Sequence, residues 1–144
     1  MAQISQILKD ISRFGRGYRE EKLAPLGISS RYALYLREIA AAPGISQEQL
    51  TARIGINKSN VARQVAALEE EGYISRCPCG KDKRVLRLYP TEKTEALIPG
   101  IMEVMDSWEL LLVENLTPAE QEQLEVMLLR LRDSALAATR EGEQ

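Results

Sequence analysis

Apolar residues recur at three- and four-residue steps along most of the chain, which is the spacing of amphipathic helices. The first such stripe consists of Ile4, Ile7, Leu8, Ile11, Phe14 and Tyr18. Pro25 and Gly27 interrupt it, and Ser29 or Ser30 then stands where a helix cap is favoured. The second stripe consists of Tyr32, Leu34, Tyr35, Leu36 and Ile39. The motif APG ends it at Gly44, so the pattern predicts two helices before residue 45.

Two short helices joined by a tight turn are predicted next. Ser46 followed three residues later by Gln49 is a capping-box pattern, and Gly55 ends this helix. Asn57 then caps the following helix, whose apolar face consists of Val61, Val65 and Leu68. Its opposite, polar face consists of Ser59, Asn60 and Arg63. Since residues 57–68 contain no acidic side chain, the pair is typical of a helix-turn-helix.

A β-hairpin and two longer helices complete the predicted elements. Segments 73–77 and 84–90 are β-branched or alternating and flank a turn at 78–83. Thr91 is placed to cap a helix with the apolar stripe Ile101, Val104, Met105, Trp108 and Leu112. Pro99-Gly100 is expected to kink or interrupt this helix. Thr117, Pro118 and Glu120 form the start of a last helix with the stripe Leu124, Met127, Leu128 and Leu131.

The order of elements predicts a mainly α fold with a small β-hairpin wing, a winged helix-turn-helix, in a single chain of 144 residues. The DNA-binding lobe would occupy residues 29–91. The flanking segments 1–24 and 92–140 carry more apolar surface than so small a lobe needs. We therefore expect them to be dimerisation helices of a two-fold homodimer.

Charge and histidine content narrow the function further. Residues 92–144 hold four basic and twelve acidic side chains, whereas residues 56–91 hold seven basic and four acidic ones, so the net charge of -2 hides a basic lobe. Histidine, the commonest metal ligand and general base, is absent. The sequence therefore favours a DNA-binding protein over an enzyme, with no cofactor and no metal. The N-terminal residues lack a signal peptide and no apolar run could span a membrane, which predicts a cytoplasmic protein.

The segment LAPLGISSRYALYLREIAAAPGISQEQLTARIGINKSNVARQVAALEEEGYISR, followed by KDKRVLRLYPTEK, resembles the multiple antibiotic resistance regulator (MarR) family of transcription factors. The resemblance spans roughly residues 4–135, and its most specific parts are NKSNVARQVAALEEEGYI and Asp82-Lys83-Arg84 in the wing. It implies a homodimer that binds a pseudo-palindromic operator in double-stranded DNA and commonly represses nearby genes. The implied major-groove contacts are Lys58, Ser59, Asn60 and Arg63. In the wing, Arg84 would reach the flanking DNA with Asp82 as its brace, beside Lys83.

Cys77 and Cys79 lie in this wing. Two cysteines without histidine are a poor zinc site, and a disulfide across Cys-x-Cys would be strained and therefore reducible. Neighbouring Arg76 and Lys81 favour the thiolate. A redox sensor that reshapes the wing is one hypothesis, and two incidental thiols in a variable turn are the other.

The family also commonly binds small aromatic or phenolic acids between the dimer helices and the DNA lobe. The resemblance implies a candidate effector pocket, and the residues that could line it are Arg16, Tyr32, Tyr35, Met105 and Trp108. Stripes of methionine and aromatic residues are more often plain core. Two other functions stay open, namely a thiol enzyme or redox adaptor that acts through Cys77 or Cys79, and a winged helix that binds another protein.

Overall fold

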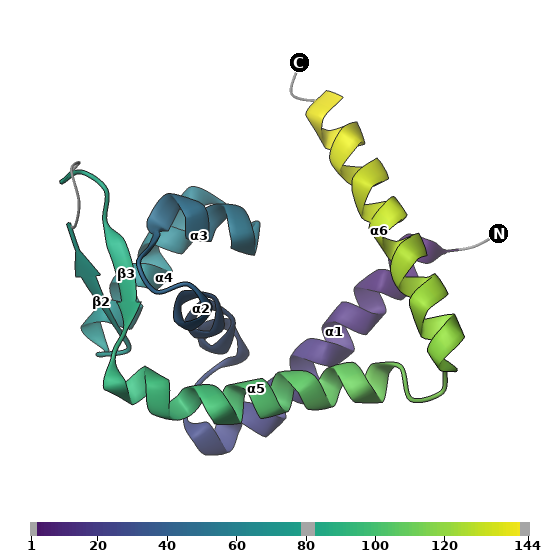
Figure 1. Cartoon of the computed structure of the whole chain (residues 1–144), viewed down its shortest axis with the longest axis horizontal. Helices are drawn as coiled ribbons and strands as arrows, with labels where there is room; N and C mark the ends of the chain where they lie inside the picture. Colours follow the sequence, from purple (N-terminus) through teal and green to yellow (C-terminus); the bar gives the residue numbers. More distant parts are fainter. Residues whose placement is uncertain (1–2, 79–82, 142–144) are drawn as a thin grey trace. The chain divides into compact units, whose positions relative to one another are not determined.

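The computed structural model describes residues 3–78 and 83–141 and is mainly helical, with one small antiparallel sheet (Figure 1). Its elements in chain order are α1 (Ile4–Leu23), a 3-10 turn (Ala24–Leu26), α2 (Ser30–Ala41), β1 (Ile45–Ser46), α3 (Gln47–Ile54), α4 (Lys58–Glu70), β2 (Ile74–Cys77), β3 (Arg87–Pro90), α5 (Glu92–Leu112) and α6 (Pro118–Glu141). This confirms the predicted fold class, a winged helix-turn-helix formed by α3, α4 and the β2–β3 hairpin. In the described parts of the chain, no helix is long and apolar enough to cross a membrane.

Side-chain caps start the helices where the sequence predicts them. The Ser29 hydroxyl accepts a hydrogen bond from the Tyr32 amide at 3.1 Å and so starts α2. Ser46 and Gln49 form the complete capping box of α3. The side chain of Asn57 accepts from the first turn of α4. These caps satisfy amides that have no partner inside their own helix, and they fix where each helix begins.

The sheet has three strands in the order β1-β3-β2, one more than the predicted hairpin. Leu88 at its centre pairs with Ile45 of β1 and with Arg76 of β2. The β1 strand has two residues, too few to show an alternating pattern, and for that reason the sequence did not predict it. Arg87 donates to the Gly44 carbonyl at 3.0 Å and joins β3 to the connection before α3.

The hydrophobic core lies among α2, α3, α4 and the sheet. Its fully buried side chains include Tyr35, Leu36, Leu50, Leu88 and all three residues of the predicted apolar face of α4, Val61, Val65 and Leu68. Ile101 brings α5 into the same core. The polar face of α4 is thereby turned outward, because residues three and four apart share one side of a helix.

Pro99 lies inside α5, and the helix runs without a break from Glu92 to Leu112, so the proline does not interrupt it, and the predicted kink stays a prediction. Proline removes one amide donor from a helix of 21 residues, and core packing by Ile101 just beyond it offsets that loss. The neighbouring Gly100 has no side chain, which leaves room for Leu26 in close contact.

The chain forms two compact units, residues 1–108 and 109–144. The second unit consists of the end of α5, a turn and α6, and it starts α6 with the predicted capping box of Thr117 and Glu120. The exposed large apolar side chains of this unit are Leu110, Leu111, Leu112, Val126, Met127, Leu128, Leu129, Leu131 and Leu136. So much apolar surface on a short unit marks an interaction site.

Gly15 of α1 packs against the indole of Trp108. A Cβ added there would lie 2.9 Å from Trp108 Cε2, closer than a side chain tolerates. We expect Gly15→Ala to lower the free energy of unfolding by about 1 kcal/mol, since overpacking outweighs the gain in helix propensity. Gly17→Ala is the control, because nothing lies within 4 Å of its added Cβ, and it should raise stability slightly. Urea unfolding followed by Trp108 fluorescence measures both, and equal stabilisation by the two variants would contradict the packing.

Candidate nucleic-acid interface

The first two turns of α4 present the predicted DNA contacts on one outward side. Lys58, Ser59 and Arg63 are exposed, and Asn60 is half-buried. Asn57 holds this end of the helix through a 2.9 Å hydrogen bond from the Asn60 amide. Side chains at the start of a well-capped helix are suited to reach base edges in a major groove.

Arg63 has an internal partner on the same face. Its Nη2 atom donates a hydrogen bond to Asn60 Oδ1, one turn earlier. The guanidinium has five donors in a planar fork, so one bond to Asn60 orients the group and leaves most of its donors for a base or a phosphate. The sequence placed both residues on one face without revealing that one orients the other.

The wing carries two further predicted contacts in the turn before β3. Lys83 and Arg84 are both exposed there. Asp82, the predicted brace of Arg84, lies outside the described residues. The hairpin thus presents two cations beside a recognition helix that has no acidic residue in its first turn.

An ion pair that the sequence analysis missed ties the wing to α4. Arg76 of β2 donates to Glu69 near the end of α4 at 2.9 Å. This hydrogen bond holds the pKa of the Glu69 carboxyl below its usual range. The pair therefore contributes stability at neutral pH and loses it as the pH falls through that lowered pKa. The two residues lie on different elements, so no local pattern reveals their contact.

Of the two cysteines of the wing, the structure describes Cys77. Cys77 ends β2, is half-buried and is disulfide-bonded. Cys79 lies outside the described residues. Elsewhere, over 3–78 and 83–141, no group of three or more acidic, cysteine or histidine side chains is placed to hold a metal ion.

The predicted effector-pocket residues have different environments. Tyr35 is fully buried in the core, where burial raises its hydroxyl pKa, and within the described parts of the chain that hydroxyl has no hydrogen-bond partner. Tyr32 is half-buried and lines a cavity of ≈ 560 Å³ at the start of α2. Met105 packs against the core, and Trp108 stacks on Tyr18 with ring centroids 5.4 Å apart. Arg16 is exposed on α1.

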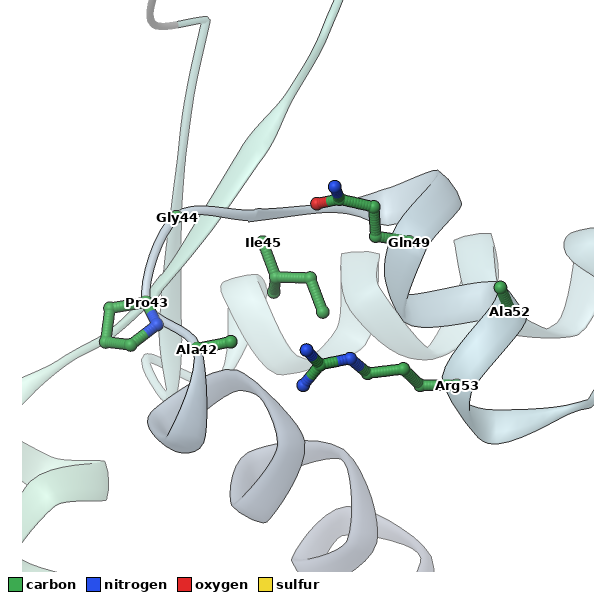
Figure 2. Close-up of a pocket in the computed structure, with 7 residues that line it drawn as sticks. All are labelled: Ala42, Pro43, Gly44, Ile45, Gln49, Ala52 and Arg53. Atoms are coloured by element: carbon green, nitrogen blue, oxygen red, sulfur yellow. The ribbon is translucent and has the colours of Figure 1, made fainter.

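A second cavity, of ≈ 460 Å³, lies where the α2–α3 connection meets α3 (Figure 2). Gln49 and Arg53 reach it from α3, and Ile45 from β1. Arg53 already pairs with Glu38 at 3.6 Å. The cationic group that lines this cavity therefore has a partner within the chain, and we do not assign the cavity a role in DNA binding.

Comparisons with known proteins agree with this geometry. Residues 26–85, which span α2 to the wing, match the family model of the MarR family. The fold of the transcriptional regulator SlyA matches at a TM-score of 0.87 and 27% identity, covering 93% of this chain and 94% of that one. A MarR transcriptional regulator from Methanosarcina mazei Go1 matches at a TM-score of 0.80 and 27% identity, covering 94% of this chain and 90% of that one.

A third similar structure contains nucleic acid. It is a MarR family transcriptional regulator from Listeria monocytogenes complexed with 26mer DNA, with a TM-score of 0.86, 25% identity and coverage of 93% of this chain and 89% of that one. The family match covers the helix-turn-helix and the wing up to residue 85, before β3, and the fold matches extend over the segments at both ends that are predicted to dimerise. Residues 26–85 therefore match the MarR family, and the fold of the chain is similar to those of winged helix-turn-helix transcriptional regulators of this family.

Proposed function

We propose that this regulator is a homodimeric repressor that binds a pseudo-palindromic operator. The observation that carries the proposal is the outward face of α4, where Arg63 is oriented by Asn60 beside Lys58 and Ser59. The exposed cations Lys83 and Arg84 of the wing extend this face. Such a surface combines groups that read base edges with groups that neutralise phosphates. The Listeria monocytogenes relative in complex with DNA supports the same use of the fold.

The apolar surfaces at both chain ends support the homodimer. On α1 the exposed apolar side chains are Ile4, Ile7, Leu8 and Phe14, and on the 109–144 unit they continue along α6. A monomer rarely leaves contiguous surfaces of this kind in water. A two-fold interface would cover the same patches on both copies and place two recognition helices on two half-sites.

Selection from a random-sequence duplex pool tests the proposal. The full-length protein is expected to enrich a two-fold symmetric site and to bind it about a thousandfold or more above unrelated DNA at physiological salt. Sedimentation of the free protein should give a dimer. Enrichment of no site, or of a single unrepeated half-site by a monomer, would contradict it.

Arg84 provides a test of the wing. Arg84→Ala is expected to weaken binding of the selected site about threefold or more and to make the slope of log K against log salt less steep, because a phosphate contact releases about one counterion. Titrations at several salt concentrations measure the slope. Arg37→Ala is the matched control, since Arg37 pairs with Glu38 on α2. An unchanged slope in Arg84→Ala would remove the wing from the interface.

Release by a small aromatic acid is part of the same proposal. The Trp108 and Tyr18 rings meet at a tilt with their centroids 5.4 Å apart, and among the described residues the buried Tyr35 hydroxyl has no hydrogen-bond partner. A phenolic acid that binds near Trp108 would change the emission of the single tryptophan and weaken DNA binding over the same concentration range. Fluorescence and DNA-binding titrations with salicylate measure both effects. An unchanged signal in both would leave the protein without this class of effector.

The disulfide-bonded state of Cys77 favours a second function, a thiol-based redox sensor. Cys77 lies on β2 beside Arg76, whose partner Glu69 belongs to α4, so a change at the thiol would act on the strand that joins the wing to the recognition helix. Under this proposal, reduction of the bond by dithiothreitol is expected to change operator affinity at least about threefold, and peroxide added to the reduced protein is expected to reverse that change. Cys77→Ser and Cys79→Ser should abolish the response, and a wild-type protein indifferent to both reagents would exclude the sensor.

A further inference from the structure

The C-terminal end of α4 is closed by a Schellman motif. The Tyr73 amide donates to the Leu68 carbonyl at 2.9 Å, and the Gly72 amide donates to Glu69 at 3.1 Å. Gly72 has φ +83°, the left-handed conformation that this motif requires. The carbonyls of Leu68 and Glu69 are thereby satisfied, and the carbonyls of residues 71–73 belong to the turn that follows the helix.

Those three successive carbonyls accept hydrogen bonds from Thr91, just before α5, and from two residues of the first turn of α5. The bonds are Lys93 Nζ to Glu71 O at 3.0 Å, Thr91 Oγ1 to Gly72 O at 2.7 Å and Thr94 Oγ1 to Tyr73 O at 2.6 Å. We call the three donors Thr91, Lys93 and Thr94 the carbonyl clamp. The Thr91 amide adds a fourth bond, to Tyr73 O at 3.1 Å.

The clamp is held in place on both sides. Thr94 is fully buried, so its short hydrogen bond is shielded from water. Lys93 also stacks on the Tyr73 ring, with its ammonium 4.1 Å from the ring centroid. Tyr73 in turn meets Tyr32 edge to face, with centroids 5.8 Å apart. Bonds to three consecutive backbone groups fix orientation as well as distance, because a rotation of the turn would lengthen at least one of them.

We infer that the carbonyl clamp is a positioning device that sets the direction of the recognition helix relative to α5, and thereby the spacing between operator half-sites that the dimer accepts. The inference rests on the proposed function, in which the end helices form the dimer and α4 enters the DNA. None of the three clamp residues needs to touch DNA in this role.

The size of the effect follows from DNA geometry. Half-sites are separated in steps of about 3.4 Å per base pair, and the two recognition helices must meet them about one helical turn apart. One base pair also rotates a half-site by about 35°, so a small change in both the position and the direction of α4 in each protomer corresponds to about one base pair of spacing. A stiff clamp makes a dimer that rejects wrong spacings, and a loose one makes a dimer that tolerates them.

Thr94→Val and Thr94→Ser are the matched pair that tests the clamp. Valine keeps the buried volume and removes the hydroxyl, and serine keeps the hydroxyl. A site selected by the wild-type protein is lengthened or shortened by one base pair between its half-sites, and dissociation constants are measured at one salt concentration. The wild type and Thr94→Ser are expected to bind the lengthened and the shortened site about tenfold or more weakly than the selected site. Thr94→Val is expected to bind the lengthened and the shortened site no more than about threefold more weakly than the selected site.

The spacing profile separates positioning from mere stability. A purely structural threonine would lower the melting temperature and weaken all spacings by one factor, so an unchanged profile in Thr94→Val overturns the inference. If that variant does not fold, Lys93→Met on the exposed side of the clamp takes its place, with the same expected flattening. If the wild type selects a symmetric site and all variants keep its profile, the inference fails and the proposed function stands. If the wild type selects no site, both fail.

Discussion

Leu68→Ala is expected to lower the free energy of unfolding by about 2–5 kcal/mol, the largest effect of any single substitution considered for this chain. Leu68 is fully buried on the inner face of α4, and its carbonyl accepts the Tyr73 amide that closes the helix. Removing its side chain leaves a cavity directly beneath the recognition helix. A loss of operator affinity should accompany the loss of stability, because α4 no longer rests on a packed core.

Leu68→Met separates the cavity from the change of residue. Methionine keeps nearly the same volume and should cost less than about 1.5 kcal/mol. Urea unfolding monitored by circular dichroism gives both values at one protein concentration, which must be held fixed if the protein dimerises. A Leu68→Ala protein as stable as the Leu68→Met protein would mean that this position does not belong to the core.

Local chemistry made the helix starts predictable. Ser46 with Gln49, and Thr117 with Glu120, form capping boxes between residues three positions apart, so the sequence contains both partners of each contact. The buried face of α4 was equally predictable, because a helical period places its apolar residues on one side. These local features sufficed to define the helix-turn-helix.

Contacts between distant residues could not be predicted. Arg76 pairs with Glu69 across a strand and a helix, and Thr94 reaches the carbonyl of Tyr73, 21 residues earlier. Thr91 stands at the predicted start of α5, but its hydroxyl donates to Gly72. A threonine before a helix predicts a local cap from sequence alone, and only the fold reveals that its donor serves another element.

The apolar stripes of the helices could be predicted from the sequence, but the surface that covers each stripe could not. Ile101 of α5 is fully buried within the chain, whereas Leu112, on the same predicted stripe, is 41% exposed. Both fit a helical apolar pattern, and the pattern does not distinguish a core from an interface. The same holds for the candidate DNA contacts. The apolar face of α4 shows which side is polar and outward, but it does not show what that polar side binds.

Arg63→Ala is expected to weaken binding to the selected operator by about 1–3 kcal/mol, roughly five- to a hundredfold, and to relax sequence preference at one position of each half-site. Arg63 lies on the outward face of α4, and Asn60 Oδ1 accepts a bond from its guanidinium. The group is therefore oriented before DNA arrives, and less side-chain entropy is lost on binding. Arg63→Lys keeps the charge without the planar fork, so it should recover affinity for DNA in general and little of the sequence preference.

Two controls distinguish base reading by Arg63 from a loss of positive charge. Arg37→Ala removes the same charge from α2, where Arg37 pairs with Glu38 at 3.3 Å, and should leave the preferred sequence unchanged. Asn60→Ala keeps Arg63 and its charge but removes both the partner of Arg63 and a predicted base contact, so it should also weaken binding and relax sequence preference. Affinities for the selected site and for single-base variants at each position measure preference directly. If Arg63→Ala weakens all of them by one common factor, Arg63 binds phosphate, and the base-reading role passes to Lys58, Ser59 or Asn60.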